Sequence, residues 1–328
     1  MQNNKTCANQ PEPGREPPAH VKRVLRREVN YGCPVPGCGE PFLEWHHFDP
    51  TWSEEKHHRP EGMIALCTQH HPQADAGTFE IETLKGFKAN PNPLEVVTAK
   101  FNWMPSRCLI RLGGCYSFNC FRIPNPFLPI PTNEPLLVID RNEMGLVTLS
   151  FKLKTSDDTL LAAMYENFLE VSKDAIHDLS ISASGNRIKI WLAERDVGFE
   201  FHFSRKSFEE IQKNVWDEEI KILHEISPDV EPKDSWLTSK NRWNDQLRQQ
   251  LLGMFEKDEV SSFAQSQWLP ITSMLVFRFA MQFPEKEGVP VFDLVSCKLN
   301  HNGKSITMRD GILTSPWMRA GMCTFTIS

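Results

Sequence analysis

The sequence predicts an α+β protein with a small N-terminal metal-binding region and a larger, mostly antiparallel β region with several helices. The segment from Cys33 to Gly77 contains three of the nine cysteines and six of the eleven histidines. Such a density is typical of a metal site and not of a packed core. Around this segment apolar residues recur at helical spacing, whereas beyond residue 100 short β-rich segments alternate between apolar and polar residues.

Composition limits the classes of protein. The 328 residues predict about two domains, and 40% hydrophobic residues predict a folded chain. No apolar run approaches the roughly 20 residues that cross a bilayer, and the N-terminus is polar, so we expect a cytoplasmic protein with reduced thiols. The net charge of −6 excludes a broad positive field. Binding to nucleic acid would therefore depend on local clusters of Lys and Arg.

Residues 1–19 are rich in proline and predict a flexible lead-in to a first domain over 20–92. A helix is expected from His20 to Asn30, because Val21, Val24, Leu25 and Val29 have helical spacing. Its basic residues lie largely off that face and would face a phosphate backbone; they are Lys22, Arg23, Arg26 and Arg27. An ordinary solvated helix face is the alternative.

Four residues have the spacing of a structural zinc site. Cys33 and Cys38 lie in a loop rich in glycine and proline, and Cys67 and His70 are separated by two residues. Two such pairs are typical of tetrahedral zinc ligands. The alternative, that these residues are merely buried, does not explain the paired spacing.

A hairpin and a helix are expected to carry this site. The first strand ends near His47, the return strand spans Met63 to Leu66, and the helix runs from Thr68 through Ala76, with Gly77 as its C-cap. Because neighbouring residues in a strand point to opposite faces, His46 and His47 should do different work, one on a metal and one on a substrate.

The intervening loop carries His57, His58 and Arg59. Arg59 is a candidate for holding a phosphate, or else a surface charge. A short helix around Leu84 and the stop at Asn90 to Pro93 complete the domain.

The order Cys-x4-Cys, His-His-x-x-Pro and Leu-Cys-x-x-His-His resembles the HNH endonuclease family in its zinc-stapled, ββα-metal form, over about residues 20–90. The resemblance implies that His47 is the general base and that His46 and His71 bind a catalytic divalent ion. The chain departs from the family at Gly62, where the family has an asparagine. His57 and His58 lie in the same loop, and one of them is a candidate to replace it; His58 is counted among the candidate catalytic residues.

The implied chemistry suits hydrolysis of a phosphodiester. A neutral imidazole can activate water near pH 7, and a bound cation can stabilise charge on the phosphate and on the departing oxyanion. Besides structural Zn²⁺, we therefore expect a catalytic Mg²⁺, Mn²⁺, Ni²⁺ or Zn²⁺; imidazole ligands favour the last three.

The remainder, residues 93–328, is predicted to be β-rich, with a β module over 100–205, helices over 206–260 and a β-rich end over 261–328. Within it we expect a helix from Leu160 to Val171, a capping box at Ser207 and Glu210, and a second helix from Lys240 to Lys257. A hairpin turn is expected at Asn302 and Gly303. This region is expected to bind substrate, a regulatory protein or a small-molecule ligand.

The sequence thus predicts a metal-dependent nuclease, with DNA as the leading substrate and phage defence or restriction as a plausible setting. Two alternatives stay open. The first alternative is that the substrate is RNA and not DNA, since no base-reading element is recognisable. Or the zinc fold is a non-catalytic module that binds nucleic acid or protein, which the glycine at position 62 would allow.

Overall fold

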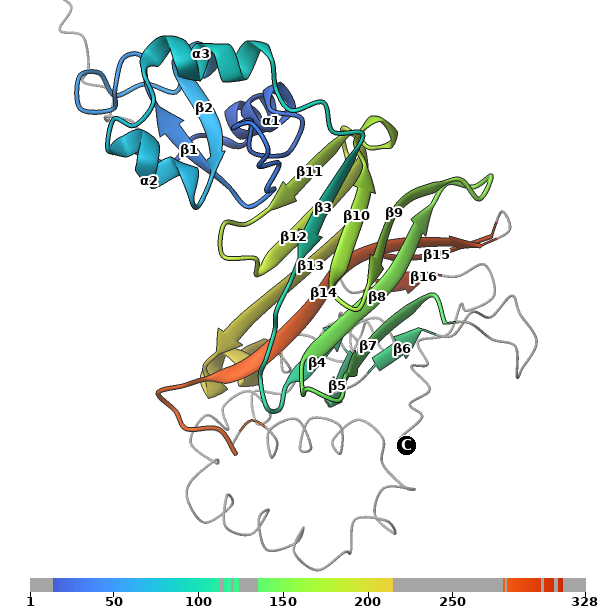
Figure 1. The fold of residues 1–328 in the computed structure, drawn as a ribbon. Coiled ribbons are helices and arrows are strands. Elements are labelled where there is room, and N and C mark those ends of the chain that lie inside the picture. Colours follow the sequence, from blue (N-terminus) through green and yellow to red (C-terminus); the bar gives the residue numbers. More distant parts are fainter. Residues whose placement is uncertain are drawn as a thin grey trace, which may run out of the picture. The chain divides into compact units, whose positions relative to one another are not determined.

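The computed structural model describes residues 14–112, 115–118, 121–123, 135–214, 280, 282–301, 304–309 and 312–314. These residues form a mixed α+β structure with few helices and mostly antiparallel strand pairs (Figure 1). Within them, no helix has the length and apolar character needed to span a bilayer. The predicted α+β class is confirmed at this level.

The chain forms two compact units that interleave along the sequence. The described residues of unit 1 fall within 1–101, 150–200 and 299–303, and those of unit 2 within 102–149, 201–298 and 304–328. The sequence predicted successive blocks instead. Which segments share a compact unit depends on strand pairing between distant parts of the chain, and local sequence patterns do not indicate that pairing.

The N-terminal part of unit 1 is a two-stranded hairpin with three helices around it (Figure 1). Its elements are α1 (Ala19–Glu28), β1 (Leu43–His47), the 3₁₀ turn η1 (Pro60–Gly62), β2 (Met63–Cys67), α2 (His70–Asp75) and α3 (Ile81–Ala89). Every residue of β2 is buried, and Val21 and Leu25 of α1 pack into the same core. Gly77 has a φ of 76°, the left-handed conformation expected where the chain leaves α2.

The rest of unit 1 is antiparallel sheet. One set of strands has the order β3-β10-β9-β8, and another has the order β11-β12-β13. Their bounds are β3 (Val96–Lys100), β8 (Val147–Lys154), β9 (Leu160–Tyr165), β10 (Phe168–Ser172), the 3₁₀ turn η2 (Lys173–Ala175), β11 (Asp178–Ile181), β12 (Arg187–Ala193) and β13 (Asp196–Lys206). Strands β8 and β13 continue into unit 2.

The helix predicted from Leu160 to Val171 is wrong, because these residues form β9 and β10. The two strands pair antiparallel, with Leu169 opposite Met164. Glu166 and Asn167 both have positive φ, 45° and 71°, as a tight hairpin turn requires. The buried run Leu161 to Met164 has no alternation, so its pattern alone does not separate a strand from a helix.

Unit 2 contains β4 (Leu109–Leu112), β5 (Cys115–Phe118), β6 (Phe121–Ile123), β7 (Leu137–Arg141), β15 (Lys304–Arg309), β16 (Ile312–Thr314) and all but the last three residues of β14 (Val289–His301). Strands β14 and β4 are parallel, with Val291 opposite Leu109. The capping box is confirmed: the backbone N–H of Glu210 donates to Ser207 Oγ at 3.2 Å, and that of Ser207 to Glu210 Oε2 at 2.8 Å. The predicted helix at 240–257 and the turn at 302–303 lie outside the described residues.

Candidate metal centres

The three cysteines and the histidine predicted as zinc ligands converge on one point. The donor atoms of Cys33, Cys38, Cys67 and His70 all lie within 4.8 Å of one another. Cys38 Sγ is 3.8 Å from Cys67 Sγ, and His70 Nδ1 is 3.4 Å from Cys33 Sγ and 3.2 Å from Cys67 Sγ. A tetrahedral zinc ion with Zn–S bonds of about 2.3 Å and Zn–N bonds of about 2.0 Å has edges of roughly 3.5–3.8 Å. The cluster therefore fits a metal ion such as zinc.

Two of the three cysteines in this cluster are buried. Cys33 and Cys67 are 0% and 1% exposed, and the described cysteines form no disulfide. Burial raises the pKa values of the Cys33 and Cys38 thiols above the ordinary value. A bound cation reverses this effect, because it stabilises thiolate and releases protons on binding.

A second cluster of candidate metal ligands is formed by residues of β1 and α2. His46 of β1, with His71 and Asp75 of α2, places three donor atoms within 4.8 Å of one another. His46 Nδ1 is 3.1 Å from Asp75 Oδ1, and His71 Nδ1 is 3.3 Å from Asp75 Oδ2. The two imidazoles meet edge to face, with centroids 5.5 Å apart. Both histidines were predicted from the sequence as metal ligands, and the structure brings them together.

The hydrogen bonds of His71 are compatible with a metal ion in this second cluster. His71 Nε2 is 3.3 Å from the Trp45 carbonyl oxygen, which can only accept a hydrogen bond, so Nε2 carries the proton. In the neutral ring, Nδ1 then directs its lone pair at the Asp75 carboxylate. Two electron-rich atoms in this arrangement need a proton or a metal ion between them, and a carbonyl that fixes the distal nitrogen is typical of metal-bound histidine.

Asp75 is a candidate ligand that was not predicted from the sequence. It follows His71 by four residues, so one face of α2 carries both side chains. This spacing was available in the sequence, but the acidic residue gave no motif of its own. With Asp75 the cluster has two nitrogen ligands and one oxygen ligand, and burial lowers the pKa of His46, which favours its neutral, ligating form.

His47 has different neighbours from His46, as alternation along β1 predicts. Its Nε2 lies 3.0 Å from the His57 carbonyl oxygen and therefore donates to it, which leaves Nδ1 as the atom that can accept a proton. The ring lies 4.8 Å from that of Trp52 and 5.9 Å from that of His58. Burial is the main cause that lowers the pKa of His47 to about 4, so the ring is neutral at pH 7.

His57 braces the loop that orients His47. Its Nε2 donates to the Pro50 carbonyl at 2.9 Å, and its Nδ1 accepts from the backbone N–H of Arg59 at 3.1 Å. A Cβ at Gly62 would lie 2.1 Å from the Asp49 carbonyl oxygen and 2.9 Å from His57 Cε1. Glycine at this position is thus required by the packing of the loop. An asparagine would not fit, and the imidazole of His57 supplies the cross-loop hydrogen bonds.

His58 lies beside this arrangement. Its ring stacks on that of Trp52, with centroids 5.4 Å apart, and its Nε2 donates to the Gly14 carbonyl at 2.9 Å. Among the described residues, its buried Nδ1 has no hydrogen-bond partner. A catalytic role for His58 stays a prediction.

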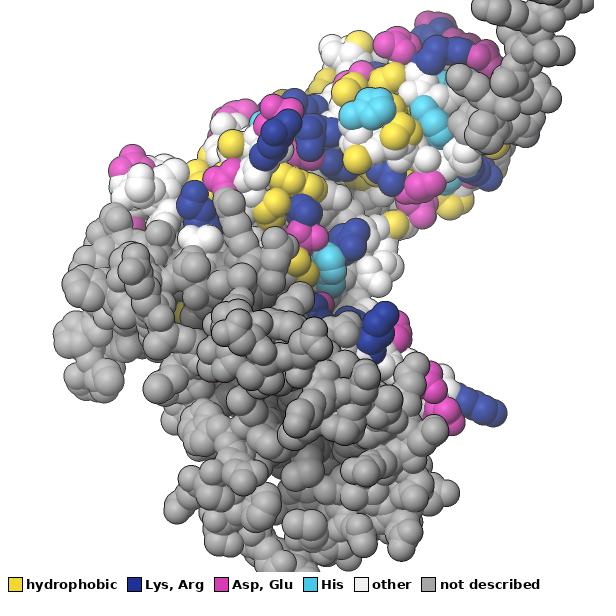
Figure 2. All heavy atoms as spheres, turned by 180° about the vertical axis from the view of Figure 1, so that it is seen from behind, with side chains coloured by type: hydrophobic (Ala, Val, Ile, Leu, Met, Phe, Trp, Pro, Cys, Tyr) yellow, Lys and Arg dark blue, Asp and Glu magenta, His cyan; other side chains and the backbone are white. Residues whose placement is uncertain are grey.

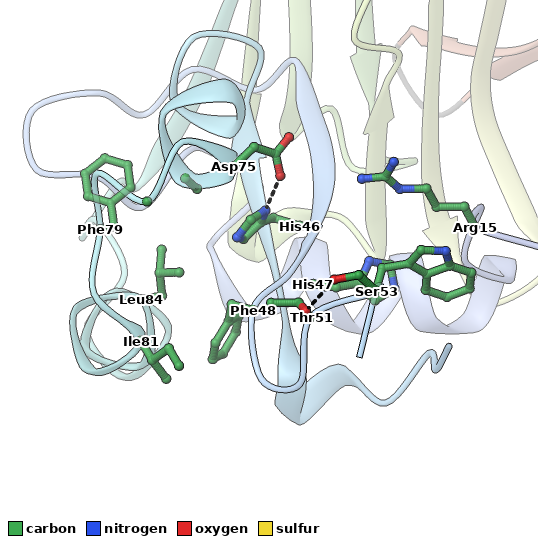
Figure 3. A pocket seen from close by; sticks show the side chains of 13 residues that line it. Arg15, His46, His47, Phe48, Thr51, Ser53, Asp75, Phe79, Ile81 and Leu84 are labelled. Atoms are coloured by element: carbon green, nitrogen blue, oxygen red, sulfur yellow. Dashed lines mark hydrogen bonds and ion pairs between the residues drawn. The ribbon is translucent and has the colours of Figure 1, made fainter. Parts of the chain in front are cut away.

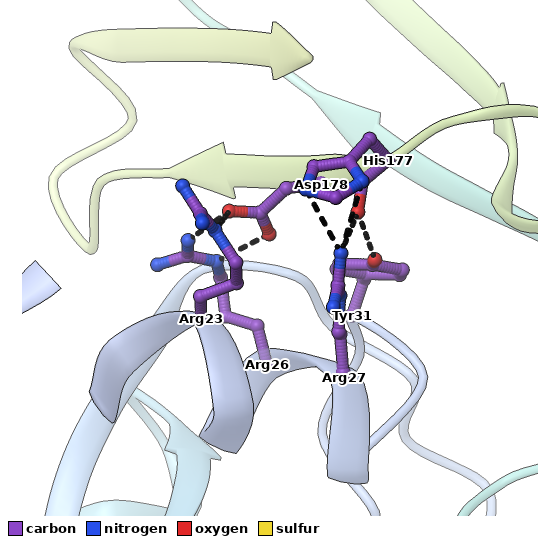
Figure 4. A network of polar contacts seen from close by, with 6 residues as sticks. All are labelled: Arg23, Arg26, Arg27, Tyr31, His177 and Asp178. Carbon is purple, nitrogen blue, oxygen red and sulfur yellow. Dashed lines mark hydrogen bonds and ion pairs between the residues drawn. The ribbon is translucent and has the colours of Figure 1, made fainter. Parts of the chain in front are cut away.

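The arginines of α1 contact protein groups (Figure 4). Arg26 is 7% exposed and forms a two-point ion pair with the fully buried Asp178, which Arg23 also contacts at 3.3 Å. Arg27 donates to the His177 carbonyl at 2.7 Å. Arg26 is therefore not part of a solvated basic face, contrary to the helical pattern, because a buried carboxylate compensates its burial.

Phosphate binding by Arg23, Arg27 and Arg59 stays a prediction. Arg59 is exposed and pairs with Glu55 four residues earlier. Both partners lie at the surface, where such pairs contribute little to stability.

A pocket of about 450 Å³ opens beside the second cluster and His47 (Figure 3). His46, His47 and Asp75 line it together with Arg15, another residue that the sequence analysis did not single out. Two residues of the candidate metal cluster, His46 and Asp75, and the neutral imidazole of His47 thus line one pocket.

Comparison with known proteins does not identify the chain. No family model, curated protein or solved structure matches it.

Proposed function

We propose that this protein is a metal-dependent endonuclease of the HNH, ββα-metal class, which hydrolyses phosphodiester bonds, with DNA as the leading substrate. The observation that carries the proposal is the division of labour between adjacent residues of β1. His46 contributes to a candidate metal cluster with His71 and Asp75, whereas His47 is a neutral imidazole lining the same pocket. A scaffold that only needed zinc would require the cysteine cluster alone.

Each residue then has a defined task. The Nδ1 atom of His47 takes a proton from the attacking water, while its Nε2–H bond to the His57 carbonyl fixes the ring and stabilises the charge that develops on it. His46, His71 and Asp75 would hold a divalent cation, and such a cation would supply charge stabilisation at the scissile phosphate and at the leaving oxygen. Arg15 offers a guanidinium at the edge of the pocket that matches phosphate oxygens.

The donor set limits the metal. Two imidazoles and a carboxylate suit Mn²⁺, Ni²⁺ or Zn²⁺ and accept Mg²⁺ less well. Three protein ligands leave positions for water and phosphate oxygen, as catalysis requires. The cysteine cluster, with four soft or borderline donors, would take structural zinc.

The decisive experiment is a cleavage assay on plasmid DNA, single-stranded DNA and RNA with Mg²⁺, Mn²⁺, Ni²⁺ or Zn²⁺. We expect His47→Ala to lower the cleavage rate by roughly 10²–10⁴-fold, the usual contribution of a general base. His20→Ala, which removes an exposed imidazole at the start of α1, is the matched control and should cleave like the native protein. Equal cleavage by folded His47→Ala and native protein would refute the assignment. Absence of cleavage on every substrate would favour a non-catalytic binding module.

A further inference from the structure

The pocket beside the second cluster has two chemically different halves. Figure 3 shows Arg15 and His47 on one side of His46 and Asp75, and an apolar group of side chains on the other. The apolar half consists of Phe48, Phe79, Ile81 and Leu84. Phe48 and Leu84, at 3% and 2% exposure, belong to the hydrophobic core, so a ligand would meet chiefly Ile81, which is 45% exposed, and the partly buried Phe79.

The polar half is sufficient for the chemistry of a phosphodiester. A phosphate group needs cations, hydrogen-bond donors and a base, and Arg15, His47 and the His46–His71–Asp75 cluster offer them. Nothing in a phosphate group is apolar.

Core packing accounts for Phe48 and Leu84, which leaves Ile81 and Phe79 as the part of the apolar half open to another part of the substrate. Trp52 adds an aromatic ring beside His47 in the same pocket. The face of a nucleobase is the apolar surface that lies nearest to a scissile phosphate.

We infer that the apolar half binds one unstacked nucleobase next to the scissile phosphate, so that the substrate is a single strand or a duplex with an unpaired nucleotide. This inference rests on the proposed nuclease function. A base inside a duplex is held by stacking and pairing, and its extrusion into a pocket costs a few kcal/mol. A base that is already unpaired avoids that cost.

The distribution of charge points in the same direction. Proteins that bind duplex DNA through its backbone use several Lys and Arg contacts. Here the chain has a net charge of −6, and on the face in Figure 2 the described basic and acidic side chains are interspersed. Arg23, Arg26 and Arg27 of α1 contact Asp178 or His177. Single strands also contact basic side chains, but they gain additional affinity from bases that stack on aromatic side chains, and Trp52 and Phe79 line this pocket.

The test compares two single strands of equal length, one of deoxythymidine and one of abasic spacers, with the native protein and with Ile81→Trp. The bulky indole fills the rim of the apolar half. Val24→Trp, on an equally exposed aliphatic residue of α1, is the matched control. The measured quantity is kcat/KM in the metal that supports cleavage.

The native protein should cleave the deoxythymidine strand on the order of 5- to 150-fold faster than the abasic strand, the effect of one stacked base. Ile81→Trp should reduce this ratio towards one, and Val24→Trp should leave it unchanged. Equal cleavage of both strands by the native protein, or an unchanged ratio in Ile81→Trp, would overturn the inference while leaving the nuclease intact. Absence of cleavage of any nucleic acid would instead refute the proposed function.

Discussion

The two candidate metal clusters both draw residues from the β1–β2 hairpin and α2, and Cys33 and Cys38 come from the loop before β1, but the clusters differ in closure. The cysteine cluster has four donors, two of them on buried residues, with separations that match a complete tetrahedron. The His46–His71–Asp75 cluster has three donors, and the side chain of Asp75 is 46% exposed beside a pocket of about 450 Å³. A closed donor set stabilises a fold, whereas an open one leaves coordination positions for substrate and water.

The difference also explains why the sequence contains so many histidines within one short segment. His70 and His71 are neighbours in α2, yet His70 faces the cysteines and His71 faces His46. His46 and His47 are likewise neighbours in β1, yet His46 contacts Asp75 and His47 contacts the His57 carbonyl. Two elements of regular structure thus direct adjacent imidazoles to two separate tasks.

The largest expected effect would come from opening the closed cluster. Cys67→Ala should abolish stoichiometric zinc binding and unfold the hairpin region, because structural zinc contributes an apparent ~10–16 kcal/mol in small domains, comparable to or above a domain's ~5–15 kcal/mol. Zinc content by mass spectrometry and amide hydrogen exchange in β1 and β2 measure both effects. Cys297→Ala, a buried cysteine of β14, should keep the zinc and the exchange protection. Retained zinc in Cys67→Ala would show that the cluster is not a closed site.

A smaller effect is expected from the open cluster. Asp75→Asn should leave the protein folded and weaken Mn²⁺ or Ni²⁺ binding at the second site by at least the ~10–100-fold typical of losing an outer-shell partner. Calorimetric titration of zinc-loaded protein measures this affinity. Glu44→Gln is the control, because Glu44 Oε2 lies 3.7 Å from His71 Nδ1 and outside the cluster. Unchanged affinity in Asp75→Asn would remove the carboxylate from the ligand set.

The smallest effect concerns the loop between the clusters. Gly62→Ala should lower the free energy of unfolding by about 1–3 kcal/mol, because its Cβ would collide with the Asp49 carbonyl oxygen at 2.1 Å. Gly86→Ala in α3 meets no atom within 4 Å and should stabilise the protein by about 0.5–1 kcal/mol. Denaturant melts compare the two variants. A neutral Gly62→Ala would mean that the loop adapts without the bracing role of His57.

Much of the candidate site followed from local spacing. Short stretches of sequence determine the pairs Cys33–Cys38 and Cys67–His70, the end of β1 at His47 and the helix cap at Gly77. In such stretches the conformation depends directly on turn residues and on the alternation of apolar and polar residues. Asp75 and Arg15 were missed because their relevance comes from where α2 and the N-terminal segment pack. The helix predicted at 160–171 was wrong because a buried run lacks the alternation that separates a strand from a helix.

The sequence by itself thus determined the α+β class, the two pairs of candidate zinc ligands and the different neighbours of His46 and His47, since each depends on residues close together in the chain. Only the tertiary structure decided which of the clustered residues share a site. It added Asp75 to the histidines, explained Gly62 by the contact of its position with Asp49 and His57, and paired Arg26 with Asp178 across more than a hundred residues. The physical reason is that ligand geometry, burial and charge compensation depend on distances in space, which sequence separation does not encode.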